Sequence, residues 1–136
     1  MNRQDLKNLA LTRLKEVEVL LKNRQYSGAY YLSGYVIECA LKACIAKQTH
    51  KFDFPDKKTV MDSYTHDLEK LVKVAKLDTQ LKSLLNDNDF SIRWSTVKDW
   101  SEESRYEKHN RQKALDIYSA ITHPNHGVLQ WLQQHW

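Results

Sequence analysis

The chain has 136 residues, of which 41% are hydrophobic and 28% are charged, a balance typical of a soluble globular protein and not of a disordered segment. Only three glycines and two prolines are present, too few turn residues for most β-sandwiches and barrels, so we expect helices with short connections. The net charge of +4 is compatible with an anionic partner, but nucleic-acid-binding proteins concentrate their basic residues on one face.

Two helices are predicted in the first third of the chain. Apolar residues recur at helical spacing over residues 5–23, with charged residues between them, which indicates an amphipathic helix. Residues 26–48 are apolar around nearly the whole circumference, and such a helix is normally buried. We expect this second helix to be the central element on which the others pack.

The rest of the chain predicts shorter helices. Residues 49–65 form a link that is interrupted at Pro55 and holds one short turn near residues 58–63. Thr65 or His66 is expected to cap the next helix, and Asp78 is expected to cap a short one that ends at residues 86–89. Residues 90–100 fit either a helix or an ordered loop. Asn110 or His109 begins a further helix, and a last amphipathic turn follows residue 124.

Together these segments predict an all-α fold, an antiparallel up-and-down bundle of four to five main helices in one domain over residues 1–136. Cys39 and Cys44 lie in the buried helix and point in different directions, which is typical of free thiols in a reducing compartment. The chain opens on an amphipathic segment and not on the apolar core of a signal peptide. Ser33, Glu38 and Lys42 interrupt the longest apolar stretch, so we expect a cytoplasmic protein without a membrane span.

A polar line runs along the buried helix. Gly34, Glu38 and Lys42 are spaced four apart and share one side. One interpretation is an ordinary Glu-to-Lys pair on a solvent-facing strip. The other is that this strip lines a groove or a subunit contact, where Glu38 orients a cation such as Arg105, because an unpaired buried charge is costly.

Arg105 and His109 form a second candidate pair. Four residues apart, they would face the same way in a helix. Histidine as acid and base, with arginine holding the phosphate, is chemically suited to RNA cleavage. The alternative is a solvated polar segment between two helices, and Glu107 beside the pair would repel an anion unless it is neutralised.

Metal binding is not expected from the histidine spacing. His123 and His126 are three apart, but Pro124 interrupts the helix between them, and neither a cysteine nor a clear carboxylate completes a tetrahedral set. We predict no metal and no cofactor.

Residues 26–43, YSGAYYLSGYVIECALKA, contain small and aromatic residues that lead to Glu-x-x-x-Lys. This pattern resembles the second helix of bacterial HEPN domains (higher eukaryotes and prokaryotes nucleotide-binding). Residues 66–71, HDLEKL, are similar to the start of that family's third helix, and residues 100–107 resemble its Trp…Arg-Tyr-Glu segment. The resemblance spans nearly the whole chain.

This resemblance implies a bundle of four or five helices that commonly forms a homodimer. Many members are encoded beside a minimal nucleotidyltransferase in toxin–antitoxin or defence systems. Active HEPN toxins are metal-independent ribonucleases whose motif is Arg, four to six residues, then His. This sequence departs from that motif, because only three residues separate Arg105 from His109. Its Arg-Tyr-Glu segment is more similar to a nucleotide-binding or partner-binding version of the fold.

We therefore expect a homodimeric HEPN-domain protein that binds a nucleotide or RNA phosphate, paired with a nucleotidyltransferase. Arg105 would contact the phosphate, and Glu38 would orient Arg105. Lys42 would add positive electrostatic potential at the site, and His66 would lie nearby. Two alternatives stay open. One is a metal-independent ribonuclease toxin that uses Arg105 and His109, and the other is a purely structural bundle that binds the nucleotidyltransferase partner.

Overall fold

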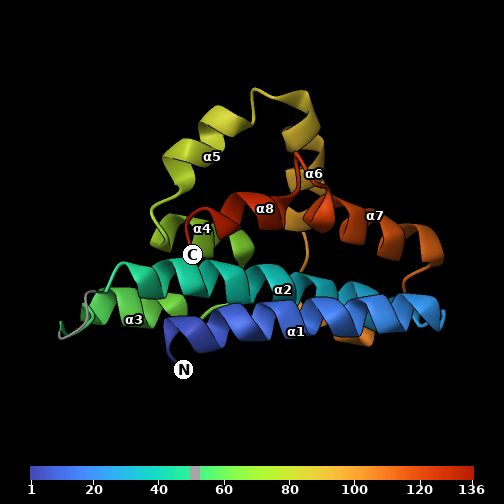
Figure 1. Cartoon of the computed structure of the whole chain (residues 1–136), viewed down its shortest axis with the longest axis horizontal. Coiled ribbons are helices and arrows are strands. Elements are labelled where there is room, and N and C mark those ends of the chain that lie inside the picture. The colour runs from blue at the N-terminus through green and yellow to red at the C-terminus, as the bar shows by residue number, and fades with distance from the viewer. Residues whose placement is uncertain (50–52) are drawn as a thin grey trace.

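The computed structural model describes residues 1–49 and 53–136, which form helices and connecting segments and contain no β-strand (Figure 1). The α-helices and the single 3₁₀ helix, η1, are α1 (Arg3–Lys22), α2 (Tyr26–Lys47), α3 (Lys57–Ser63), α4 (Leu68–Val74), α5 (Asp78–Leu84), α6 (Asn88–Lys98), η1 (Glu102–Tyr106), α7 (Arg111–Thr122) and α8 (Val128–Gln133). The predicted all-α bundle is confirmed.

Helices α1 and α2 lie side by side and run antiparallel (Figure 1). The end of α1 is closed by Arg24, whose backbone is left-handed with φ 57°, and by the Gln25 N–H, which donates to the Leu20 carbonyl. This tight reversal needs only three residues between the two helices. Both predicted ranges agree with the observed helices to within two residues.

Helix α2 is the centre of the molecule, as predicted. It contacts α1, α4, η1, α7 and α8, and more than half of its side chains are buried. Burying a large aliphatic side chain contributes about 1.5–3 kcal/mol, so the packing of neighbouring helices around α2 is the main source of the protein's stability. The largest fully buried side chains of the core include Ile37 and Leu41 of α2 with Leu68, Leu71, Ile117, Ile121 and Leu132 of its neighbours.

Both cysteines of α2 are buried free thiols. Burial raises the pKa of Cys39 and of Cys44 to about 11, so both stay protonated at neutral pH. None of the helices in the described part of the chain combines the length and apolar composition that a membrane span requires.

Two of the predicted helix caps are wrong. Helix α4 is capped by Asp67, which accepts from the Lys70 N–H, and not by Thr65 or His66. The Thr65 hydroxyl accepts from the Asp67 N–H instead, and His66 makes a tertiary contact. Asp78 is the first residue of α5 and not its cap, because the chain closes α4 immediately before it, through the left-handed residue Lys76.

Other expected boundaries are settled by side-chain caps. The polar run at residues 86–89 does more than end α5, because Asp87 caps α6 by accepting from the Asp89 N–H. Residues 90–100, left open between helix and loop, are helical as far as Lys98. Asn110 is the cap of α7. The predicted short turn near residues 58–63 is α3, and residues 50–52 of the predicted link lie outside the described residues.

A close contact between Trp100 and Gly34 fixes the segment that leads to η1. A Cβ atom on residue 34 would lie 1.9 Å from two atoms of the Trp100 ring, so the indole lies against the bare backbone of α2. Trp100 is 2% exposed, and its Nε1 donates to the Tyr31 carbonyl at 3.1 Å. The indole therefore places η1 beside the middle of α2.

Replacing Gly34 by alanine should destabilise the protein, because the Cβ atom and the buried indole cannot both be accommodated. Alanine gains up to about 1 kcal/mol in helix propensity, but overpacking costs more, and we expect a net loss of about 2 kcal/mol. Gly28→Ala is the matched control, since its Cβ would meet only Leu20 at an ordinary 3.5 Å. Thermal unfolding of both variants tests this. Equal melting temperatures would contradict the close contact.

Candidate functional site

Four ionisable side chains from three parts of the chain meet near Tyr35. Glu38 and Lys42 come from α2, His66 from the segment before α4, and Glu102 from η1; we refer to these residues as the Glu38 cluster. The Lys42 ammonium donates to the Glu38 carboxylate at 2.9 Å, and His66 Nδ1 lies 2.9 Å from the same carboxylate. His66 Nε2 lies 3.0 Å from Glu102. One imidazole thus bridges two carboxylates.

Burial is uneven across the Glu38 cluster. Glu38 is 4% exposed, whereas the side chains of Lys42, His66 and Glu102 are 26%, 41% and 38% exposed. A buried carboxylate needs a cation or hydrogen-bond donors, and Lys42 and His66 provide both. The cluster therefore has a buried anionic centre and a solvent-facing rim where a ligand can make contact.

Two tyrosines form the wall of the site next to the cluster. The Tyr35 ring makes edge contacts with His66, at 6.0 Å between centroids, and with Trp100, at 5.0 Å. The Tyr31 hydroxyl donates to the Tyr35 hydroxyl at 3.3 Å. Burial raises the pKa of Tyr35 well above its usual value, and the bond with Tyr31 acts in the same direction. Both features keep the Tyr35 phenol protonated.

The expected contact between Glu38 and Arg105 is wrong. Glu38 is already compensated by Lys42 and His66, and Arg105 lies exposed on η1. Its guanidinium carbon lies 4.8 Å from the centre of the Tyr106 ring. Tyr106 is the main cause of a raised pKa of Arg105, and Tyr31 adds to it. Arg105 therefore lies exposed on η1 beside Tyr106.

The expectation that Arg105 and His109 share a helix face is also wrong. Helix η1 ends at Tyr106, and the chain is extended at Glu107. The His109 ring stacks on Tyr30 with 3.8 Å between centroids, and its side chain is 6% exposed. The backbone N–H of His109 donates to the Ser27 hydroxyl at 2.9 Å. The imidazole is thus held in the protein interior against α2.

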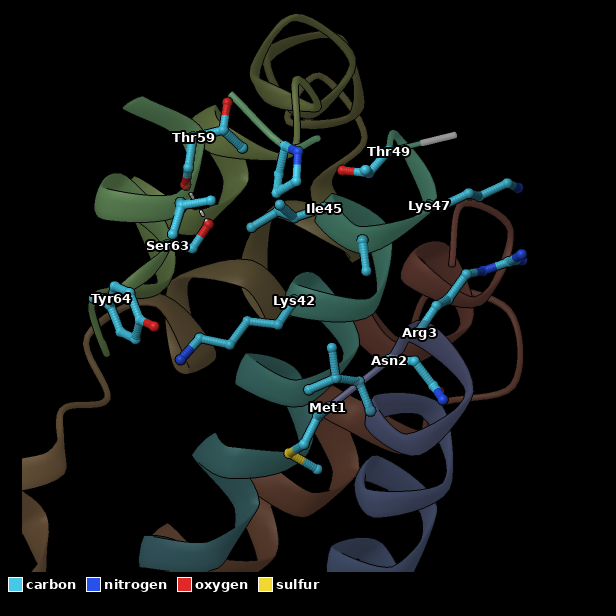
Figure 2. Close-up of a pocket in the computed structure, with 14 residues that line it drawn as sticks. Met1, Asn2, Arg3, Lys42, Ile45, Lys47, Thr49, Thr59, Ser63 and Tyr64 are labelled. Carbon is cyan, nitrogen blue, oxygen red and sulfur yellow. Dashed lines mark hydrogen bonds between the residues drawn. The ribbon is translucent and has the colours of Figure 1, made fainter. Parts of the chain in front are cut away.

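Two cavities adjoin the Glu38 cluster. The larger, which we name the Lys42 cavity, has a volume of about 840 Å³ between the start of α1, the end of α2 and α3 (Figure 2). Figure 2 shows the Lys42 side chain extending toward Tyr64, whereas Arg3 and Lys47 point to the opposite side. The smaller, of about 500 Å³, is lined by Tyr31, Tyr35, Glu38 and Lys42 among others. Lys42 lines both cavities, and their volumes are in the range of small-molecule sites.

One group in the described residues has the spacing of metal ligands, and the sequence analysis missed it. The potential ligand atoms of Asp87, Asp89 and His126 lie within 4.8 Å of one another. His126 is nearly 40 positions from the two aspartates, so only the fold reveals the group. Asp87 already caps α6, both aspartates are exposed, and we assign no metal site. His123 holds a turn instead, since its Nδ1 accepts from the His126 N–H at 3.0 Å.

Comparison with known proteins gives one family. The sequence-family model of the HEPN domain matches residues 4–123 of this chain. The comparisons with curated proteins and with solved structures found no match.

Glu38→Gln should destabilise the protein by about 2 kcal/mol, because a neutral amide replaces a buried charged acceptor that makes two partly buried contacts. Glu103→Gln is the matched control, since Glu103 lies on the neighbouring η1 and is exposed. Chemical denaturation at neutral pH measures both changes. A loss of stability that is no larger for Glu38→Gln than for Glu103→Gln would contradict the buried-anion interpretation.

Proposed function

We propose a function from one established premise: the chain belongs to the HEPN domain family, whose model matches most of its length. Membership suggests a function related to nucleotides or RNA. The function that the geometry supports best is binding of a nucleotide or RNA phosphate at the rim of the Glu38 cluster.

The observation that carries this proposal is the position of Lys42. Its ammonium has three hydrogens, and Glu38 accepts one of them at 2.9 Å. The side chain is 26% exposed and lines both cavities of the site, so its other hydrogens can be donated to a ligand phosphate. Glu38 fixes the direction of the ammonium and reduces the entropy that lysine loses on binding.

Arg105 would supply a second phosphate contact. Within the described residues no carboxylate pairs with its guanidinium, which leaves the planar donor set available for bidentate binding. The negative charge of Glu102 on the same rim opposes anion binding, but its carboxylate is engaged by His66 Nε2 at 3.0 Å. Tyr31 and Tyr35 offer aromatic surface for a base.

The chain's association with other proteins is also a proposal. Leu11 and Val19 of α1 are 39% and 58% exposed, and we propose that this helix contributes to a homodimer. We propose further that the protein pairs with a nucleotidyltransferase in a toxin–antitoxin or defence system in the cytoplasm.

The prediction that residues 1–136 form one domain stays a prediction, because the family match ends at residue 123.

Calorimetric titration with AMP, ATP and GTP tests the binding proposal. We expect Lys42→Gln and Arg105→Gln each to weaken binding about tenfold or more, since each removes a charge-assisted hydrogen bond. Lys22→Gln is the control, because Lys22 is exposed at the far end of α1. Absence of heat with the native protein, or equal affinities for all variants, would refute the proposal. Co-purification with a nucleotidyltransferase without bound nucleotide would favour the purely structural role.

The ribonuclease alternative stays a prediction. The His109 ring is buried, its Nε2 lies 3.3 Å from a carboxylate oxygen of Glu107, and it would have to leave its stack on Tyr30 to reach a phosphate beside Arg105. Expression of the chain alone in bacteria tests this activity. A toxin should arrest growth and His109→Ala should relieve the arrest, whereas normal growth with the native chain would exclude a toxic ribonuclease.

A further inference from the structure

A second basic cavity lies on the other side of α3 from the Lys42 cavity. It has a volume of about 650 Å³ between α3 and α4, and we name it the lysine cavity. Thr59 and Tyr64 line both this cavity and the Lys42 cavity, so the two are neighbours separated by α3. Helix α3 itself has no buried residue.

The lysine cavity carries uncompensated positive charge. Lys70, Lys73 and Lys76 line it at intervals of three residues, which places them along one side of α4 and its end. Asp62 is the one carboxylate among its described lining residues, and Lys58 already binds it at 2.6 Å. The Lys42 cavity has no carboxylate among its described lining residues. Both cavities therefore attract anions.

Exposed aromatic surface lies between the two cavities. Tyr64 is 81% exposed at the end of α3, and Met61 on the same helix is 62% exposed. A tyrosine ring that shares a cavity lining with lysines matches one ligand class well. Nucleic-acid strands combine phosphates, which lysines bind, with bases, which stack on aromatic rings.

We infer that α3, Tyr64 and the lysine cavity form a binding surface for a single strand of nucleic acid. Phosphates contact Lys70, Lys73 and Lys76, and one base stacks on Tyr64. A duplex keeps its base faces in its own stack, so it cannot use the tyrosine. The inference extends the proposed function, since the strand would continue past Tyr64 to Lys42, but the three lysines that bind its phosphates are not part of the Glu38 cluster.

Fluorescence anisotropy of labelled 12-nucleotide RNA and DNA strands tests the surface. We expect the single strands to bind more tightly than AMP and than a 12-base-pair RNA duplex. The combined variant Lys70→Gln/Lys73→Gln/Lys76→Gln should weaken binding about tenfold or more at low salt. It should also reduce the slope of log affinity against log salt by about 2, because each single-strand phosphate contact contributes about 0.7.

A matched variant separates site binding from general charge attraction. Lys15→Gln/Lys22→Gln/Lys113→Gln removes the same charge from exposed positions on α1 and α7. If both triple variants weaken strand binding equally, the inference is overturned. Tighter binding of anionic lipid vesicles than of the strands would overturn it too. Comparison of the RNA and DNA strands shows whether the ribose hydroxyl contributes.

Tyr64 provides an independent test of the stack. Tyr64→Ala should weaken strand binding about tenfold, whereas Tyr64→Phe should retain it, because only the ring is required. The residue is exposed, so neither variant should affect folding. Equal loss with both variants, or loss with neither, would overturn the role of the ring.

The two proposals fail in different ways. If AMP binding depends on Lys42 but the strands bind no more tightly than AMP, the inference is wrong and the proposed function stands. If strand binding depends on the three lysines while Lys42→Gln and Arg105→Gln change nothing, the proposed function is wrong and the inference stands.

Discussion

The buried carboxylate of Glu38 is the constraint on which the arrangement around α2 depends. An anion with 4% exposure must be compensated within the protein, and Lys42 does so from the next turn of the same helix. His66 compensates it from the segment before α4 and also lies against Glu102. One buried charge thereby connects α2, the entry to α4 and η1. The solvent-facing edge of the proposed site is built on this connection.

Local pattern was sufficient to predict the long helices but not all of the short ones. The amphipathic period of α1 and the continuous apolar composition of α2 each extend over more than five turns, so the ends of both helices follow within two residues. The left-handed turn positions are occupied by Arg24 and Lys76, residues that give no turn signal in a sequence. Thr65, His66 and Asp67 can all cap a helix, and Asp67 serves because His66 is held by Glu38.

The candidate site was predictable where its contacts are local. Glu38 and Lys42 are four apart in an apolar helix, so their pairing follows from sequence spacing. The contact between His66 and Glu102 joins residues that are 36 positions apart. It depends on the packing of Trp100 against α2, which positions η1. Arg105 and His109 would face the same way only in a continuous helix. Helix η1 instead ends at Tyr106, and His109 stacks on Tyr30. Tertiary packing overrode the local pattern at these positions.

The contact of Trp100 with Gly34 has an evolutionary consequence. An indole can lie at that place only where α2 has no side chain, so position 34 cannot gain a side chain while Trp100 is kept. Homologous chains should therefore show covariation: glycine wherever the second position is tryptophan, and larger residues only where that aromatic is replaced by a smaller group. The pair would mark those relatives in which η1 has the same docking geometry.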